Sequence, residues 1–246
     1  MTERLRTELT GAADAVSVVE CQDLSAGYAG VAVVQAVSLH CGRGEILAII
    51  GPNGSGKSTL LKRLAGLLPD MGGRVRLAGD DVTSMPTEKL ARLGLRFVPQ
   101  TRDIFPSLTV RENLMVSIGS DTTSIPRTLA LFPELKPLLH RVAGRLSGGE
   151  RKMLAIGRAL VGKPLIALLL DEPTAGLSPQ AASRIWPLIR QAAATGIGVI
   201  VVEQNVDAVL QVADNTHVLV GGRQRLFADS ASLRLRSDLG DIFMGA

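Results

Sequence analysis

Short apolar runs alternate along the chain with segments in which apolar residues recur at helical spacing. Apolar runs of strand length lie at 46–50, 165–170 and 199–202, with further strands expected at 16–21, 31–39, 74–77, 97–98 and around Val218 and Leu226. The first two of those further strands are expected to flank a Ser-Ala-Gly-Tyr turn. Helical spacing follows at about 57–67, after Gly149, at 179–194 and from Val206. Strands that alternate with helices in this way predict an α/β fold with a mostly parallel sheet.

The pattern changes between residues 104 and 145, where the sequence predicts short helices broken by prolines (Pro106, Pro126, Pro133 and Pro137). We interpret about 101–162 as a helical subdomain inserted in an α/β core that occupies 16–246. Residues 1–15 are polar and of mixed charge, which predicts a flexible N-terminal extension.

Composition and charge narrow the class of protein. Hydrophobic residues make up 46% of the 246 residues, yet every apolar run is shorter than the ~18–20 residues that span a bilayer. The net charge is +4, aromatic residues are 3% of the chain and no basic cluster stands out, so we expect no nucleic-acid partner. The N-terminus lacks a hydrophobic signal core, and we expect a cytosolic protein in which Cys21 and Cys41 are buried and unpaired.

A glycine-rich loop between an apolar strand and a helix fits the pattern G-x-x-x-x-G-K-[ST], which binds nucleotide phosphates. It comprises Gly51, Pro52, Asn53, Gly54, Ser55, Gly56, Lys57 and Ser58, with Thr59 next. The glycines let backbone N–H groups point at phosphate oxygens, and the helix N-terminus adds partial positive charge. Lys57 can reach the β- and γ-phosphates and Ser58 can bind Mg²⁺. The alternative is an ordinary glycine-rich turn, which the Gly-Lys-Ser ending and both flanks disfavour.

Two carboxylates end a later apolar strand, at Asp171 and Glu172. Asp171 can hold Mg²⁺ through water, as the acid on a second strand does in P-loop triphosphatases. Glu172 is placed to polarise an attacking water as a general base. Solvated surface charge is the alternative, but the preceding apolar run and the glycine-rich loop favour a nucleoside triphosphatase.

A second candidate anion site precedes that strand, at Leu146, Ser147, Gly148, Gly149 and Glu150. Serine and two glycines at a helix start leave exposed N–H groups. One chain cannot readily close both sites on a single γ-phosphate. The pattern therefore predicts a head-to-tail pair of subunits in which each covers the other's nucleotide.

Together the motifs GPNGSGKS, LSGGE and LLLDEP resemble the ATP-binding cassette of an ABC transporter, from about residue 16 to the end. The resemblance implies a P-loop core, an N-terminal antiparallel β-subdomain, the helical subdomain, and ATP and Mg²⁺ as ligands. It assigns Tyr28 to stacking on adenine, with a simple turn tyrosine as the alternative. It also assigns Gln100 to a link between the Mg²⁺ site and the helical subdomain.

Within that family the chain is similar to the smaller ATPase of importers for branched-chain amino acids and related amides or urea. The segments IFPSLTVREN, LALFPELKP, LSGGERKMLAIGRALV, DEPTAGLSP and the ending DIFMGA carry this similarity, while 115–128 looks shorter than usual. Most cassettes have a histidine that contacts the γ-phosphate where this chain has Gln204, and many have aspartate in place of Ser178. The importer group commonly has both departures in one of its two ATPases. An amide can donate one hydrogen bond but cannot titrate near neutral pH.

The resemblance implies an ATP-hydrolysing motor subunit, soluble when expressed alone and peripheral on the cytoplasmic face of the inner membrane. Its expected partners are a second cassette, identical or different, two membrane permease subunits and, indirectly, an extracytoplasmic solute-binding protein. Three alternatives remain. An exporter or lipid-type importer is one, a soluble ABC-type switch in DNA repair or translation is another, and a small-molecule kinase, which leaves LSGGE unexplained, is the third.

Overall fold

The computed structural model describes residues 17–101, 103–117, 124–162 and 164–244. Its strands are β1 (Ser17–Tyr28), β2 (Val31–Gly42), β3 (Ile46–Ile50), β4 (Arg74–Leu77), β5 (Asp80–Asp81), β6 (Leu95–Val98), β7 (Ala167–Asp171), β8 (Gly198–Val202), β9 (Asn215–Val220) and β10 (Arg223–Asp229). Its helices are α2 (Lys57–Leu64), α3 (Thr87–Leu93), α4 (Val110–Val116), α5 (Ser124–Leu131), α6 (Gly148–Leu160), α7 (Pro179–Ala194), α8 (Val206–Leu210), α9 (Ser230–Arg234) and α10 (Leu239–Met244), with 3₁₀ turns η1 (Pro133–Leu138) and η2 (Ala143–Arg145).

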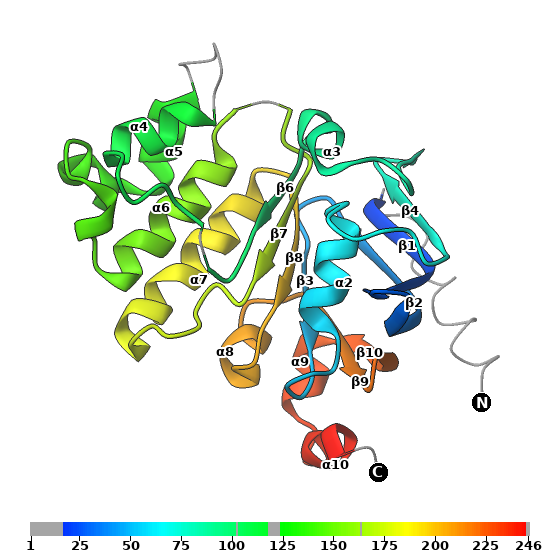
Figure 1. Cartoon of the computed structure of the whole chain (residues 1–246). Helices are drawn as coiled ribbons and strands as arrows, with labels where there is room; N and C mark the ends of the chain where they lie inside the picture. The colour runs from blue at the N-terminus through cyan, green and yellow to red at the C-terminus, as the bar shows by residue number, and fades with distance from the viewer. Residues whose placement is uncertain (1–16, 102, 118–123, 163, 245–246) are drawn as a thin grey trace.

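The strands form two sheets. The larger has the order β10-β9-β3-β8-β7-β6, in which β10 alone runs antiparallel to its neighbour. The smaller, β2-β1-β4-β5, is antiparallel throughout. Helices α6 and α7 cover one face of the larger sheet, and α2 lies on the other face, toward the smaller sheet (Figure 1). The predicted α/β fold with a mostly parallel sheet is confirmed.

The central strand β3 explains why the larger sheet is covered on both faces. Ile46, Ala48 and Ile50 point into a core shared with α6 and α7, whereas Leu47 and Ile49 point into a core shared with α2 and the smaller sheet. Successive strand residues face opposite sides, so a strand with two covered faces must be apolar at every position. All five residues of β3 are fully buried, which accounts for the unbroken apolar run.

The predicted turn at Ser-Ala-Gly-Tyr is wrong. β1 continues through these residues, and its last residue, Tyr28, pairs with Val31 across a two-residue turn. That turn is made by Ala29 and Gly30, with φ of 50° and 80°. Two-residue hairpins favour positive φ at both turn positions because this geometry matches the twist of the strands. Glycine is the residue expected at positive φ, so Gly30 indicated the turn, but alanine is unusual there and Ala29 hid the two-residue pattern.

Several predicted boundaries shift by a few residues. The predicted strand at 165–170 is β7, which begins at Ala167 and ends at Asp171, and helix α2 ends at Leu64 where 67 was expected. The helix predicted at 179–194 is confirmed at both ends as α7. Between β6 and β7 lie the short helices that the prolines predicted (α4, α5, η1 and η2), followed by α6. The predicted N-terminal extension, 1–15, and part of the segment at 115–128 lie outside the described residues.

Cys21 and Cys41 are both free and buried, as predicted. Burial raises the pKa of the Cys21 thiol to about 12, and the same cause raises the pKa of Cys41. Thiols of this kind stay protonated at neutral pH and act as small apolar side chains.

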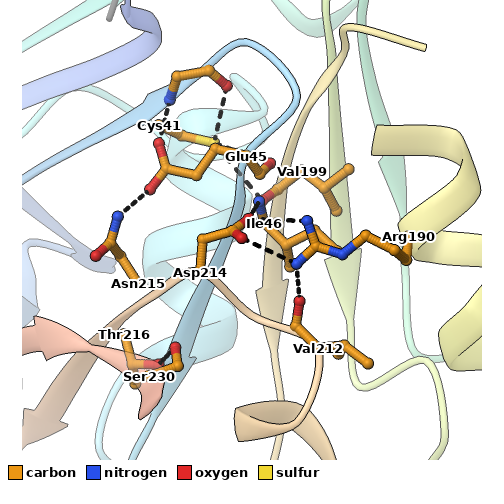
Figure 2. Close-up of polar contacts among 11 residues, drawn as sticks. Cys41, Glu45, Ile46, Arg190, Val199, Val212, Asp214, Asn215, Thr216 and Ser230 are labelled. Carbon is orange, nitrogen blue, oxygen red and sulfur yellow. Dashed lines mark hydrogen bonds and ion pairs between the residues drawn. The ribbon is translucent and has the colours of Figure 1, made fainter. Parts of the chain in front are cut away.

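A polar cluster fixes the edge of the larger sheet at which β3 begins (Figure 2). The Asp214 carboxylate accepts a hydrogen bond from the backbone N–H of Ile46 at 2.8 Å and pairs with both terminal nitrogens of Arg190, on α7, at 3.1 Å. Arg190 also donates to the carbonyl of Val212. The glycine-rich loop follows the other end of β3, so this cluster stabilises the sheet without touching the loop.

His217, on β9, is a buried imidazole with an apolar neighbour. It is 2% exposed and its ring lies 4.5 Å from that of Phe227, between centroids. Neither ring nitrogen has a hydrogen-bond partner among the described residues. Burial, and secondarily the nearby His40, lowers its pKa from 6.5 to about 3.

This burial predicts a loss of stability in acid. Because the unfolded chain binds the proton at the ordinary pKa, the contribution of His217 to stability is complete above pH 6.5 and is lost as pH falls toward 3. Between pH 7.5 and 5.5 we expect the wild type to lose about 1.4 kcal/mol more than His217→Leu, by urea unfolding at both values. The exposed His140→Gln serves as control. An equal pH response in His217→Leu and wild type would contradict the prediction.

Candidate functional site

The glycine-rich loop, between the end of β3 and the start of α2, forms one wall of a cavity of about 290 Å³. Its lining residues come from the loop, from β2 and from the ends of β7 and β8: Val33, Asn53, Gly54, Ser55, Gly56, Lys57, Ser58, Thr59, Glu172 and Gln204. Glu172 and Gln204, which are more than 100 residues from the loop in sequence, therefore lie next to it. The carboxyl ends of parallel strands lie at one sheet edge, which is where ligands bind in open α/β sheets.

Close approach of neighbouring atoms explains two of the glycines. A Cβ at Gly51 would lie 2.0 Å from the carbonyl oxygen of Leu219. Gly56 precedes α2 with φ of 97°, and a Cβ there would lie 2.9 Å from Val34. Between them, the Ser55 hydroxyl is buried without a hydrogen-bond partner among the described residues. A buried, unsatisfied hydroxyl in this loop fits an anionic ligand, because such a group is costly unless a partner binds it.

Lys57 opens α2 and lies beneath the loop. Its side chain is 5% exposed, and Nζ donates hydrogen bonds to the carbonyl oxygens of Gly51 and Pro52 at 2.8 and 2.9 Å. Burial lowers the pKa of Lys57, while Glu172 and Asp171 oppose that shift. An ammonium has three donors, so one remains for a phosphate oxygen.

Ser58 and Asp171, each predicted to bind Mg²⁺, lie in direct contact. The Ser58 hydroxyl donates to Asp171 Oδ1 at 2.7 Å, linking the start of α2 to the end of β7. Asp171 is 4% exposed; burial raises its pKa, Ser58 lowers it, and the neighbouring Glu172 charge raises it again. A carboxylate and a hydroxyl beside a phosphate cavity are oxygen ligands of the type that Mg²⁺ prefers, with few protein ligands needed.

Glu172 is held by two glutamine amides. Gln100 Nε2 donates to one carboxylate oxygen and Gln204 Nε2 to the other, each at 2.6 Å. The backbone of Glu172 has φ of 48°, a left-handed conformation that costs a residue with a side chain about 1–3 kcal/mol. Its N–H is fixed by the carbonyl of Val202 on β8 at 2.9 Å. The structure thus brings together three predicted residues from the ends of β6, β7 and β8.

Glu203 is a site residue that sequence reasoning did not single out. It is 2% exposed and accepts hydrogen bonds from the backbone N–H and the hydroxyl of Thr174, at 3.0 and 2.6 Å. It also accepts the N–H of Gln204 at 3.0 Å. Glu203 therefore orients the residue that contacts Glu172. The available signal was its place at the end of an apolar strand parallel to β7.

The second candidate anion site starts α6. Ser147 is the N-cap: its hydroxyl accepts from Glu150 N–H at 3.3 Å, and its own N–H donates to the Glu150 carboxylate at 2.7 Å. The first of these bonds uses one N–H of the first turn, and the second lowers the pKa of Glu150. Ser147 and Gly148 are exposed, whereas Leu146 is buried.

Of the residues 146–150, which we call the signature, Gly148 lines a hollow that is separate from the loop cavity. Gly148 lines a groove of about 630 Å³ together with Gln100, Asp103, Lys152 and Leu177. Gly149 packs on α7, where a Cβ would lie 3.1 Å from that of Ala181. The geometry is compatible with the expected head-to-tail pair, which itself stays a prediction.

Two further predicted residues lie apart from the cavity. Tyr28 ends β1 with 46% of its surface exposed and is not one of the described residues lining the loop cavity. Its role at adenine stays a prediction. Ser178 is the N-cap of α7 and accepts from Ala181 N–H at 3.3 Å, which gives it a structural role of its own.

A family model described as ABC transporter matches residues 34–175, more than half of the chain. The chain belongs to the ABC transporter family. It is an ATP-binding subunit of that family, and as an ABC ATPase it binds and hydrolyses ATP. Subunits of this kind work with membrane permease components. In the part of the chain that the structure describes, no helix has the length and apolarity to cross a bilayer.

Three relatives of this ABC subunit illustrate the range of similarity. BraG of Pseudomonas aeruginosa, a high-affinity branched-chain amino acid transport ATP-binding protein, is 38% identical over 90% of this chain and 97% of its own. LivF of Archaeoglobus fulgidus, a probable protein of the same kind, is 42% identical over 81% of this chain and 87% of its own. LptB of Haemophilus influenzae, of a lipopolysaccharide export system, is 34% identical over 85% and 89%.

A solved structure confirms the fold of the ABC subunit. A nucleotide-free ATP-binding cassette from an ABC transporter superposes with a TM-score of 0.83 at 26% identity, covering 94% of this chain and 100% of the other. The predicted α/β architecture with a separate antiparallel sheet is thus that of an ABC cassette.

Proposed function

We propose that this ABC subunit drives the import of branched-chain amino acids or related amides. The observation that carries the proposal is its similarity to relatives named for branched-chain amino acid transport, 38% and 42% identical, compared with 34% for a lipopolysaccharide export subunit. Export is the second candidate because that relative also covers most of the chain. The sequence departures at Gln204 and Ser178 support the import assignment.

The transport reaction itself tests this. The chain is reconstituted in proteoliposomes with permease subunits and a solute-binding protein of the branched-chain amino acid type. We expect ATP hydrolysis to rise when the binding protein carries leucine, isoleucine, valine or a short amide. Stimulation by a lipid or glycolipid, with no response to these solutes, would favour export.

The working assembly that we propose contains a second cassette, identical or different, and two permeases on whose cytoplasmic side the chain sits. A solute-binding protein outside the membrane acts on it only through the permeases. The division of the site into two hollows supports the pairing: one chain offers its P-loop to its own ATP and its signature, around Ser147, to the ATP of its partner. The segment 101–162 forms the helical subdomain in this proposal.

Hydrolysis in this proposal uses residues of the loop cavity. The loop from Gly51 to Thr59 binds the phosphates, and Lys57 contributes charge to the γ-phosphate. Glu172 accepts a proton from the attacking water as general base. Ser58, Asp171 and Gln100 would hold Mg²⁺, which would supply charge neutralisation at the β- and γ-phosphates. The hydroxyl–carboxylate contact at 2.7 Å is the feature of this chain that fits the ion.

Gln204 has two roles in the proposal. One N–H of its amide stays on Glu172, where it orients the carboxylate. Its second N–H is free to donate to a γ-phosphate oxygen, because a primary amide has two donors. Tyr28 stacks on adenine, as the resemblance implies.

The nucleotide site can be tested without transport. Lys57→Ala should weaken ATP binding roughly 10- to 100-fold, because a buried charge-assisted contact to phosphate is lost. Equilibrium binding of a fluorescent ATP analogue measures this, with Lys89→Ala, exposed on α3, as control. Equal affinity in the Lys57 variant and wild type would remove Lys57 from the site.

A further inference from the structure

A buried ion pair joins the signature helix α6 to the segment that carries Gln100. Lys152 Nζ lies 2.7 Å from Asp103 Oδ2, and the two side chains are 7% and 8% exposed. The same ammonium donates to the backbone carbonyl oxygen of Gln100 at 3.1 Å. Lys152 therefore contacts the residue whose side chain holds Glu172.

The segment beyond Gln100 is fixed at further points, none of which reaches Gln100 itself. The Arg158 guanidinium, also on α6, lies 5.0 Å from the centroid of the Phe105 ring. The Asn113 side chain, on α4, accepts from Phe105 N–H at 2.8 Å and donates to its carbonyl at 2.9 Å. These contacts keep Asp103 close to α6, but only Lys152 joins the helix to the Gln100 backbone among the hydrogen bonds of the described residues.

We propose that Lys152 is a positioning residue that couples the signature to the general base of the same chain. Ser147 caps the helix on which Lys152 lies, one and a half turns away. A helix moves as a rigid element, so contact of Ser147 with the partner's ATP displaces Lys152 and with it the Gln100 carbonyl. The Gln100 amide then shifts relative to Glu172, to which it donates a hydrogen bond. In the pair of cassettes, each ATP site is a composite of the P-loop of one chain and the signature of the other, so the state of one composite site affects the general base of the other. This rests on the proposed function of the two sites.

The ion pair is suited to this task because neither member can leave it cheaply. A buried charge without its partner is strongly unfavourable, so Lys152 stays on Asp103 as the helix moves. A neutral apolar pair of similar size would fill the same space and keep the fold, but it would provide no donor for the Gln100 carbonyl. The two functions, packing and positioning, can therefore be separated by substitution.

The test compares Lys152→Met/Asp103→Leu with wild type in ATP affinity and in kcat. We expect the affinity for a fluorescent ATP analogue to stay within about twofold, since Lys57 and its loop are unchanged, and kcat to fall about 2- to 30-fold. In the Gln100→Ala background the Lys152→Met/Asp103→Leu changes should lower kcat no further, because Lys152 acts on Glu172 only through the Gln100 side chain. In the absence of nucleotide, the rate of hydrogen exchange in the peptide 97–105 should be higher in the double variant than in wild type.

Controls separate this result from a general loss of stability. Asp214→Ala weakens the opposite edge of the sheet and should leave kcat unchanged at temperatures where it is folded. Should that pair not fold, Lys152→Leu/Asp103→Met, which also lacks a donor for the Gln100 carbonyl, is used with the same expectation. Wild-type kcat in either double variant, or effects that multiply with Gln100→Ala, would overturn the proposal. Absence of a second copy of the chain or of another cassette in the hydrolysing assembly would instead refute the proposed pairing of the two sites.

Discussion

Replacing Glu172 with glutamine should lower kcat for ATP by about 10²- to 10⁴-fold, the contribution of a general base, while ATP affinity is kept or rises. Glutamine has the size of glutamate but cannot accept a proton from water. It also removes one negative charge from the cavity that receives the γ-phosphate. In a preparation of this chain alone, every composite site carries residue 172, so the effect is not diluted by a second kind of subunit.

The measurement pairs steady-state hydrolysis with equilibrium binding of the nucleotide. Glu88→Gln, exposed on α3, controls for the loss of one carboxylate from the chain. A kcat within threefold of wild type would take the general-base role from Glu172. Loss of binding together with turnover would mean that Glu172 supports the nucleotide rather than the water.

The parallel sheet could be predicted because its strands are buried on both faces. In β7 and β8, as in β3, alternate residues enter two different cores, and every position is buried. Such strands appear in the sequence as short runs with no polar interruption. The hairpin of β1 and β2 gave a weaker signal, because one side of the pair is partly exposed and β1 is irregular, with register shifts.

Motif spacing placed the individual site residues but not their contacts. The pattern around Lys57 is local, so one continuous segment encodes the loop. That Gln100 and Gln204 would hold the two oxygens of Glu172 depends on the order of β6, β7 and β8 in the sheet, which no local pattern specifies. The Lys152–Asp103 pair, 49 residues apart, is of the same kind.

Gln204 shows what the amide changes chemically. A histidine at this position could titrate near neutral pH, and its protonated form would add a cation beside the γ-phosphate. The amide of Gln204 is neutral at every accessible pH, and it donates to Glu172 at 2.6 Å. It therefore preserves the orientation of the general base without the charge that would stabilise the transition state. A site with this composition should turn over slowly.

Ser147→Arg should depress hydrolysis by the assembled transporter more than Glu172→Gln, if the second cassette keeps its histidine. Loss of one preorganised donor at a developing charge costs on the order of 10²–10³ in rate. The site built on Lys57, Glu172 and Gln204 is then the slow one. The other site borrows the signature of this chain, and an arginine side chain at 147 would block it.

The comparison is made on the reconstituted complex, one substitution at a time, with steady-state hydrolysis as the readout. Ser147 is also a helix cap, so Asp229→Arg, which removes the cap of α9, measures the effect of losing a cap alone. Equal losses from Ser147→Arg and Glu172→Gln would mean that Gln204 suffices and that both sites hydrolyse ATP. Abolished turnover in Glu172→Gln beside a mild Ser147→Arg would reverse the assignment of the fast site. The expected order requires that most turnover pass through the site where this chain contributes its signature and its partner contributes the base.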